Sequence, residues 1–224
     1  MRSAARGRAL LLDLDGTLLD TAPDMAGALN RLRREQGRAD LPFETIRPHV
    51  SHGGAALVRL AFGGAAPAEL ERLRLRFLEL YRADLATETK LFPGFPFVLQ
   101  SLESAGIPWG IVTNKPGWLT TPLLAALGLA SRVACVVAGD TLPERKPHPA
   151  PLLHAAKLAG CEPGHCVYAG DTERDIVAGR AAGMQTVAVR FGYLALGEDP
   201  AAWRPDGIVD RPADLLDWLA PATR

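Results

Sequence analysis

Two carboxylates follow a short apolar run near the N-terminus, in the segment Ala9-Leu10-Leu11-Leu12-Asp13-Leu14-Asp15-Gly16-Thr17. The leucines predict a buried strand, and side chains two residues apart on a strand point to the same face. Asp13 and Asp15 are therefore presented together where the strand ends. Two carboxylates side by side at a buried edge are unfavourable unless a cation neutralises them. The pair predicts a cation site, although aspartates are also common in ordinary strand-to-loop turns.

Polar residues also follow three later strands of the predicted sheet. They lie in the segments Thr113-Asn114-Lys115, Gly139-Asp140-Thr141 with Arg145-Lys146-Pro147-His148-Pro149, and Gly170-Asp171-Thr172-Glu173-Arg174-Asp175. In an open parallel sheet, ligands bind beyond the carboxyl ends of the strands. We therefore expect these segments to meet the aspartate pair at one edge of one sheet.

Each segment has a physical role if the ligand is a phosphate with magnesium. Mg²⁺ prefers oxygen ligands in octahedral geometry and keeps part of its water shell. Asp13, the backbone carbonyl of Asp15, and Asp171 can supply three of those oxygens. Thr113 offers a hydroxyl to a phosphate, and Lys146 offers a positive charge to its oxygens.

Taken singly, the same residues have simpler explanations. Thr113 could cap a helix, and Lys146 could be an exposed, solvated lysine. Asp175 could pair with Arg174 on a helix surface. The prediction therefore depends on the convergence of all the segments and not on any one of them.

The hydrophobic periodicity predicts an α/β fold, a doubly wound and mainly parallel sheet interrupted by a helical insertion. Core strands are expected at 10–14, 109–113, 133–138, 166–169, 186–189 and 207–209, and core helices at 94–105, 117–127, 149–159, 173–182 and 213–219. Residues 22–86 have only helical periodicity. We assign residues 1–20 and 88–224 to the core and 21–87 to an inserted small helical domain.

Composition limits the possible partners. Lys plus Arg and Asp plus Glu both number 25, so the net charge is zero and no basic nucleic-acid surface is expected. No apolar stretch is long enough to span a bilayer, and no membrane partner is expected. The three cysteines have neither zinc-site nor disulfide spacing. We expect a cytoplasmic protein, either a monomer or a homodimer.

Together the four segments resemble the motifs of phosphatases of the haloacid dehalogenase (HAD) superfamily, and the resemblance covers almost the whole chain. It implies a Rossmann-like HAD core with a helical cap of type C1 at 21–87. It also implies Mg²⁺ as cofactor and a small phosphorylated metabolite as substrate. The cap is expected to open and close on linkers near residues 18–22 and 87–93.

The resemblance also implies residue roles. Asp13 is expected to be the nucleophile that forms an aspartyl-phosphate, and Asp15 the general acid and base. Asp175 would order Lys146 or metal-bound water. The implied phosphate-binding residues are Gly16, Thr113, Asn114 and Lys146, and the implied metal ligands are Asp13, Asp15 and Asp171.

Within the superfamily the chain most resembles the phosphoglycolate phosphatases, with phosphatases of N-acetylmuramic acid 6-phosphate as a sister group. Their cores are nearly identical, so the cap must determine the leaving group. Its specificity loop is expected to include Arg47, His49, Ser51, His52 and Gly53. The candidate cationic or donor groups for a carboxylate are Arg47, His49 and His52, together with Arg59. Ser51-His52 stands where phosphoglycolate phosphatases often have an apolar-Gly pair, so another sugar phosphate remains an alternative substrate.

Other activities fit less well. Haloalkanoate dehalogenases lack an acid at the position of Asp15, and a phosphonate hydrolase would need a lysine in the cap, where none precedes Lys90. A phosphomutase shares the core but not the cap pattern. A phospho-acceptor signalling domain would be impaired by a proton carrier such as Asp15. An inactive binding module would be expected to have lost at least one of the motif residues.

Overall fold

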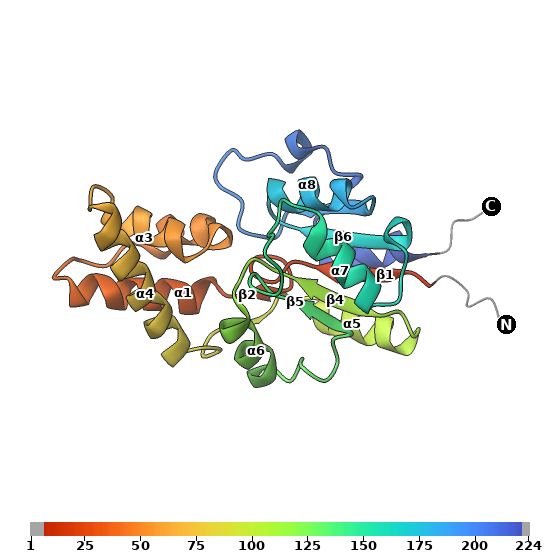
Figure 1. The fold of residues 1–224 in the computed structure, drawn as a ribbon, viewed down its shortest axis with the longest axis horizontal. Helices are drawn as coiled ribbons and strands as arrows, with labels where there is room; N and C mark the ends of the chain where they lie inside the picture. The colour runs from red at the N-terminus through yellow and green to blue at the C-terminus, as the bar shows by residue number, and fades with distance from the viewer. Residues whose placement is uncertain (1–6, 221–224) are drawn as a thin grey trace.

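The computed structural model describes residues 7–220, and its centre is a six-stranded parallel sheet (Figure 1). The strand order is β5-β4-β1-β6-β7-β8. The strands are β1 (Ala9–Leu12), β4 (Trp109–Val112), β5 (Cys135–Val137), β6 (Cys166–Gly170), β7 (Gln185–Val189) and β8 (Gly207–Val209). The predicted doubly wound α/β fold is confirmed. β1 lies between β4 and β6, so its carboxyl end is flanked by those of both neighbours.

Helices cover both faces of this sheet, which explains why β1 is apolar throughout. Leu10 and Leu12 pack on one face with α5 (Phe95–Ser104) and α6 (Gly117–Ala126). Ala9 and Leu11 pack on the other with α7 (Ala150–Leu158) and α8 (Glu173–Ala181). A strand buried on both faces reads as a continuous hydrophobic run.

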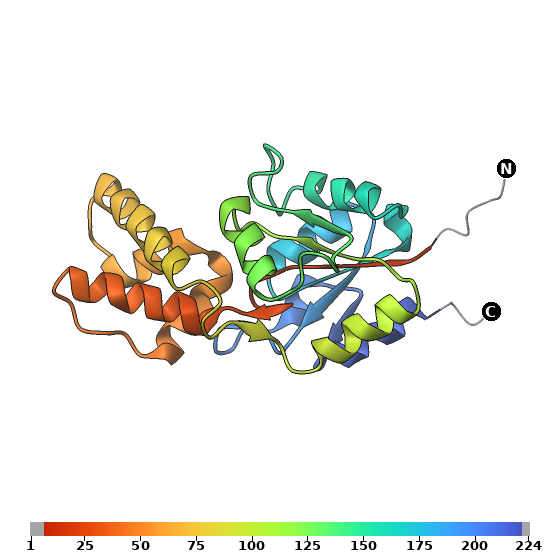
Figure 2. The same cartoon turned by 90° about the horizontal axis from the view of Figure 1, so that it is seen from below.

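The helical insertion forms a separate cap beside the core (Figure 2). It consists of α1 (Ala22–Glu35), α2 (Phe43–Ile46), the 3-10 helix η1 (Arg47–His52), α3 (Gly54–Phe62) and α4 (Pro67–Ala83). Met25, Leu29 and Leu32 form the buried stripe of α1, as their spacing predicts. The exact domain boundaries, 20/21 and 87/88, stay a prediction.

The two connections between core and cap pair with each other. β2 (Leu19–Asp20) and β3 (Lys90–Leu91) form a short antiparallel ladder. Asp24 at the start of α1 accepts hydrogen bonds from the backbone of Glu88 (2.8 Å) and Thr89 (3.0 Å). The linkers that we expect to act as hinges are therefore joined to each other.

Three elements differ from the sequence prediction. The two-residue strands β2 and β3 were not predicted, because they are too short to show a periodicity. The expected C-terminal helix at 213–219 is a 3-10 helix, η4 (Pro212–Leu219), which follows a proline at its first turn. The other short 3-10 segments are η2 (Pro163–His165) and η3 (Pro200–Trp203). Within residues 7–220, no helix combines the length and hydropathy that crossing a membrane requires.

Candidate active site

A cavity of about 610 Å³ lies between the core and the cap, and the sequence-predicted motifs surround it. We call its two sides the core wall and the cap wall. The core wall comprises Asp13, Asp15, Thr113, Asn114, Lys115, Pro116, Trp118, Leu119, Asp140, Arg145, Lys146 and Arg174. The cap wall comprises Met25, Val50, Ser51, His52, Gly53, Gly54, Ala55, Arg74, Leu75, Leu78 and Tyr81. The four polar segments therefore meet at the carboxyl ends of β1, β4, β5 and β6.

Lys146 in the core wall pairs with two buried carboxylates. Its ammonium group lies 2.8 Å from Asp13 Oδ1 and 2.7 Å from Asp175 Oδ1. It also donates to the hydroxyl of Tyr168 at 2.8 Å. Burial alone would lower the pKa of Lys146, but the two carboxylates outweigh burial and raise it. Lys146 is thus held as a buried cation and is not the solvated surface lysine that it could have been.

Asp175 has a second role at the start of α8. Its carboxylate accepts hydrogen bonds from the backbone N–H and the hydroxyl of Thr172, which forms a capping box. Although burial alone would raise the pKa of Asp175, Lys146 and then Arg174 lower it. The residue is completely buried, so it is not on the helix surface.

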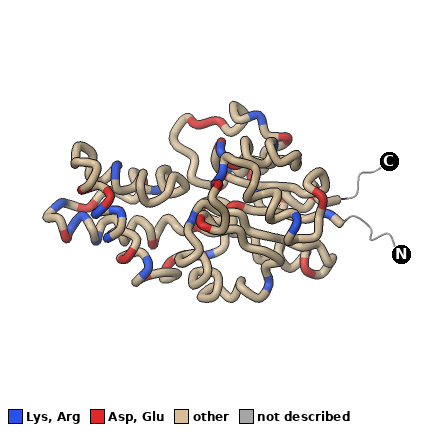
Figure 3. Tube along the Cα trace, in the orientation of Figure 1, with Lys and Arg blue, Asp and Glu red and all other residues tan. Residues whose placement is uncertain are grey.

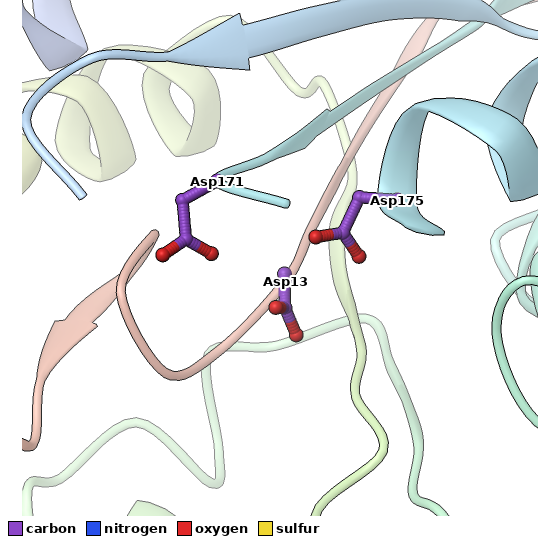
Figure 4. A group of neighbouring side chains, drawn as sticks. All are labelled: Asp13, Asp171 and Asp175. Carbon is purple, nitrogen blue, oxygen red and sulfur yellow. The ribbon is translucent and has the colours of Figure 1, made fainter. Parts of the chain in front are cut away.

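Three carboxylates converge beside Lys146 (Figure 4). Asp13, Asp171 and Asp175 each offer an oxygen, and these oxygens all lie within 4.8 Å of one another. Burial raises the pKa of Asp171 to about 7, and repulsion from Asp13 and Asp175 adds to the rise. Burial also raises the pKa of Asp13 to about 6 despite the attraction of Lys146.

These carboxylates fit a divalent cation. Asp171 has no cationic partner among residues 7–220 and accepts only from neutral groups: the backbone N–H of Tyr193 (3.0 Å), Ser51 Oγ (2.7 Å) and Thr17 Oγ1 (3.4 Å). A buried carboxylate without a counter-ion is unfavourable, and a hard cation with oxygen ligands would remove that cost. The donor set is the one that Mg²⁺ prefers.

Gly16 allows the turn after β1 to pass close to this cluster. Its backbone has a φ of 84°, in the left-handed region that favours glycine. A β-carbon there would collide with the Asp171 carboxylate. Any other residue at this position would therefore displace a carboxylate of the cluster.

Thr113 and Asn114 follow β4 and have different surroundings. Thr113 is buried at the cavity, where its hydroxyl accepts a hydrogen bond from the backbone N–H of Lys115. Asn114 lines the cavity, but its side chain is bonded on both sides to the backbone of Lys146, donating at 2.9 Å and accepting at 3.1 Å. Asn114 therefore fixes the loop that carries Lys146.

Ser51 in the cap reaches two core oxygens that are candidate metal ligands. Its hydroxyl lies 2.7 Å from Asp171 Oδ2 and 3.2 Å from the backbone carbonyl of Asp15. The guanidinium of Arg174 donates to the Ser51 carbonyl from the core side. The predicted specificity loop is thus tied to the core at both its side chain and its backbone.

The other predicted cap residues divide into two groups. His52 and Gly53 line the cavity with Ser51. Burial lowers the pKa of His52, and the nearby charge of Arg174 lowers it further. Arg47 and His49 do not line the cavity: the Arg47 guanidinium stacks on the Tyr193 ring, with its Cζ 4.9 Å from the ring centroid.

The contacts of three residues at the site, Lys115, Tyr193 and Arg174, were not predicted from the sequence. Lys115 forms an ion pair with Asp15 at 2.9 Å, and its position directly after Thr113-Asn114 was the one available signal. The Tyr193 hydroxyl accepts from the backbone N–H of Thr21 (2.6 Å) and of Ala22 (2.9 Å) and donates to the Asp20 carboxylate. Arg174 was considered only as a partner of Asp175, and its bond to Ser51 was not expected.

Comparison with known proteins identifies the family. The family model described as "Haloacid dehalogenase-like hydrolase" matches residues 10–189. This chain belongs to that family. The HAD resemblance seen in the four motifs is therefore confirmed, and the chain is a HAD hydrolase.

Individual relatives of this HAD hydrolase cover nearly its whole length. A phosphoglycolate phosphatase of Xanthomonas campestris is 48% identical over 96% of this chain and 98% of its own length. An N-acetylmuramic acid 6-phosphate phosphatase of Pseudomonas aeruginosa is 41% identical over 96% of this chain and 95% of its own. A solved structure from Haemophilus somnus, described as a predicted phosphoglycolate phosphatase, superposes with a TM-score of 0.86 at 27% identity and covers 96% of this chain and 99% of its own.

Proposed function

We propose that this HAD hydrolase is a magnesium-dependent phosphomonoesterase that converts 2-phosphoglycolate to glycolate and phosphate through an aspartyl-phosphate. One observation carries the proposal: Asp13, Lys146, Asp171 and Asp175 are buried together at the carboxyl ends of the central strands. Both sets of relatives in the comparison are phosphatases by name, which supports the reaction class.

In the first step, Asp13 attacks phosphorus and the bond from phosphorus to the leaving oxygen breaks. Lys146 and the backbone N–H of Leu14 both bond Asp13 Oδ1, at 2.8 Å and 2.7 Å, so the carboxylate has a fixed orientation. Asp15 donates its proton to the departing alkoxide, and the product alcohol leaves.

In the second step, water attacks the same phosphorus. Asp15, now a carboxylate, takes a proton from that water, and the bond from phosphorus to Asp13 breaks to release phosphate. Asp13, Asp171 and the Asp15 carbonyl would hold Mg²⁺, whose charge would balance that of the phosphoryl oxygens in both steps. Thr113 and the Lys146 ammonium would bind those oxygens.

The leaving group is assigned on the relatives and on the charges of the cavity. Several relatives of 44–48% identity over more than 90% of this chain are named phosphoglycolate phosphatases. Arg145, Arg174 and His52 line the cavity and offer donors to a small carboxylate. At neutral pH His52 would act as an uncharged donor, because its pKa is lowered.

A specific observation favours N-acetylmuramic acid 6-phosphate as a second candidate. The cavity volume of about 610 Å³ is far more than a two-carbon leaving group needs, and it is within the range of pockets for larger ligands. Trp118 and Leu75 line it and are 40% and 51% exposed, so an apolar surface is available to a sugar ring.

Steady-state kinetics would test both candidates. We expect kcat/KM for 2-phosphoglycolate to exceed that for N-acetylmuramic acid 6-phosphate and for hexose phosphates, in the presence of Mg²⁺. A higher value for the amino-sugar phosphate would reverse the substrate assignment and leave the mechanism in place. No Mg²⁺-dependent release of phosphate from any of them, or from p-nitrophenyl phosphate, would contradict the proposed reaction.

A further inference from the structure

The Asp15 carboxylate is held by one of its two oxygens. Thr21 Oγ1 donates to Asp15 Oδ1 at 2.7 Å, and Lys115 Nζ donates to the same atom at 2.9 Å. Among residues 7–220, every hydrogen bond to this carboxylate ends on Oδ1. Asp15 lines the cavity, so Oδ2 is the oxygen available to a bound phosphate ester.

Lys115 is in turn fixed by the cap. Its ammonium donates to the hydroxyl of Tyr81 at 3.0 Å and lies 4.5 Å from the centroid of that ring. Tyr81 is on α4 and completely buried, and its ring stacks on Phe77 with an interplanar angle of 9°. The ammonium therefore bridges a rigid cap aromatic and the carboxylate of the core.

Stability gives no reason for this bridge. Lys115 is 8% exposed, and removing an ammonium from water costs free energy that its partners must offset. Apolar side chains of similar volume at these positions would pack the domain interface at no such cost. The two positions also face the cavity directly.

From this geometry we propose that Lys115 and Tyr81 are positioning residues that hold Asp15 Oδ1, so that Oδ2 carries the proton to the leaving oxygen only when the cap is docked. The proposal rests on the proposed phosphatase mechanism. It adds that the cap controls general-acid catalysis through Tyr81 and Lys115, besides selecting the substrate.

The consequence is a dependence on the leaving group. An alkoxide is a poor leaving group and needs the proton of Asp15 as its bond to phosphorus breaks. A p-nitrophenolate is stable without that proton. Loss of positioning should therefore slow the first step with alkyl phosphates much more than with the aryl phosphate, whereas a general loss of structure would slow that step equally with both.

The experiment compares Lys115→Met and Tyr81→Phe with the parent on two substrates. One is p-nitrophenyl phosphate, and the other is whichever of 2-phosphoglycolate and N-acetylmuramic acid 6-phosphate the parent hydrolyses faster. Because Asp15 also serves as the base in the second step, which is the same for both substrates, the comparison uses kcat/KM, which reports the first step alone. For Lys115→Met we expect kcat/KM on the alkyl phosphate to fall about 100-fold and kcat/KM on the aryl phosphate less than about 5-fold. Tyr81→Phe keeps the ring under the ammonium and loses only the hydroxyl, so its effect should be about 10-fold on the alkyl substrate.

Arg82→Gln is the matched control. The Arg82 guanidinium lies over the Trp118 ring, 5.4 Å from its centroid, so it also links α4 to the core but does not touch Asp15. Its alkyl-to-aryl ratio of kcat/KM should equal that of the parent. Equal losses of kcat/KM on both substrates in Lys115→Met or Tyr81→Phe, or the same change of this ratio in Arg82→Gln, would overturn the proposal.

The remaining outcomes show whether a failure concerns the fold of a variant, the phosphatase mechanism or this proposal. If the circular dichroism spectrum shows that Lys115→Met is unfolded, the proposal is tested with Tyr81→Phe alone, because that change removes a single oxygen atom. A parent that releases no phosphate from either substrate would contradict the phosphatase mechanism and this proposal with it. A parent that is active but whose variants lose both rates equally would contradict only this proposal.

Discussion

The core wall and the cap wall of the cavity are charged in different ways. On the core wall, Lys115 and Lys146 are buried and each pairs with a buried or half-buried carboxylate. The cap carries many charges along α1 and α4, where acidic and basic residues are mixed (Figure 3), and its ion pairs lie at the surface. Such exposed pairs contribute roughly 0–1 kcal/mol each, whereas a buried charge that loses its partner is strongly unfavourable.

This difference separates two functions. The core wall can hold a fixed arrangement of charge around one phosphoryl group, because each buried lysine there is neutralised and held by a carboxylate. The cap wall has mostly loop backbone, histidine and apolar side chains, together with Arg74, and most of these can change without disturbing that arrangement. We infer that the core fixes the reaction and that the cap fixes the leaving group, except where Ser51 reaches Asp171 and Tyr81 reaches Lys115.

The largest effect should come from the nucleophile. Asp13→Asn is expected to lower kcat on every phosphate ester by at least about four orders of magnitude, because the amide cannot form the acyl phosphate. The size and shape are nearly unchanged, so the far-ultraviolet circular dichroism spectrum should match that of the parent. Turnover within about tenfold of the parent would show that the core wall does not do the chemistry.

Removal of the metal should be nearly as severe. EDTA is expected to abolish turnover and Mg²⁺ to restore it. Saturating Mg²⁺, at about 100 times its Kd, should raise the melting temperature of the parent by roughly 5–10 °C. Asp171→Asn should lose that shift, because a buried ligand becomes neutral.

Asp140→Asn is the control for this effect. Asp140 also lines the core wall, but its carboxylate accepts from the backbone N–H of Gly117 at 2.7 Å, away from the carboxylate cluster. The Asp140→Asn variant should keep the Mg²⁺-dependent rise in melting temperature. A shift that persists in Asp171→Asn and disappears in Asp140→Asn would place the metal elsewhere.

A third test concerns the pH dependence of stability without metal. The pKa of Asp13 is raised to about 6 and that of Asp171 to about 7, so between about pH 4 and pH 7 the folded state binds more protons than the unfolded state. The free energy of unfolding in EDTA should therefore fall as the pH rises through this range. Denaturant titrations at several pH values should show this slope reduced in Asp171→Asn and in saturating Mg²⁺. An unchanged slope in both would mean that the pKa values of these carboxylates are not raised in the folded protein.

The sequence was most informative about the core wall, for a physical reason. Its groups follow strands, and the carboxyl ends of parallel strands meet at one edge whatever the distance along the chain. Asp13, Asp171 and Lys146 could thus be placed together from local patterns. The parallel sheet was also predicted, from the alternation of strands and helices.

The contacts between domains could not be predicted in this way. Tyr81 lies 34 residues from Lys115, and Lys115 lies 100 residues from Asp15, with no periodicity that links them. The bond from Ser51 to Asp171 spans 120 residues and depends on how the cap docks. The cap loop itself is a 3-10 helix, so a helical pattern does not show which side chains face the cavity.

The smallest expected effect is also the sharpest test of the cap wall. His52 and His49 lie on one turn, with ring centroids 6.4 Å apart, but only His52 lines the cavity. His52→Ala removes a donor and widens the cavity. It should therefore lower kcat/KM for 2-phosphoglycolate relative to N-acetylmuramic acid 6-phosphate by about tenfold. The rate on p-nitrophenyl phosphate should change little, because the phosphoryl group is bound by the core wall. His49→Ala should leave the substrate ratio unchanged, and the same shift in both variants would mean that the loop acts through its backbone and not through the imidazole that faces the cavity.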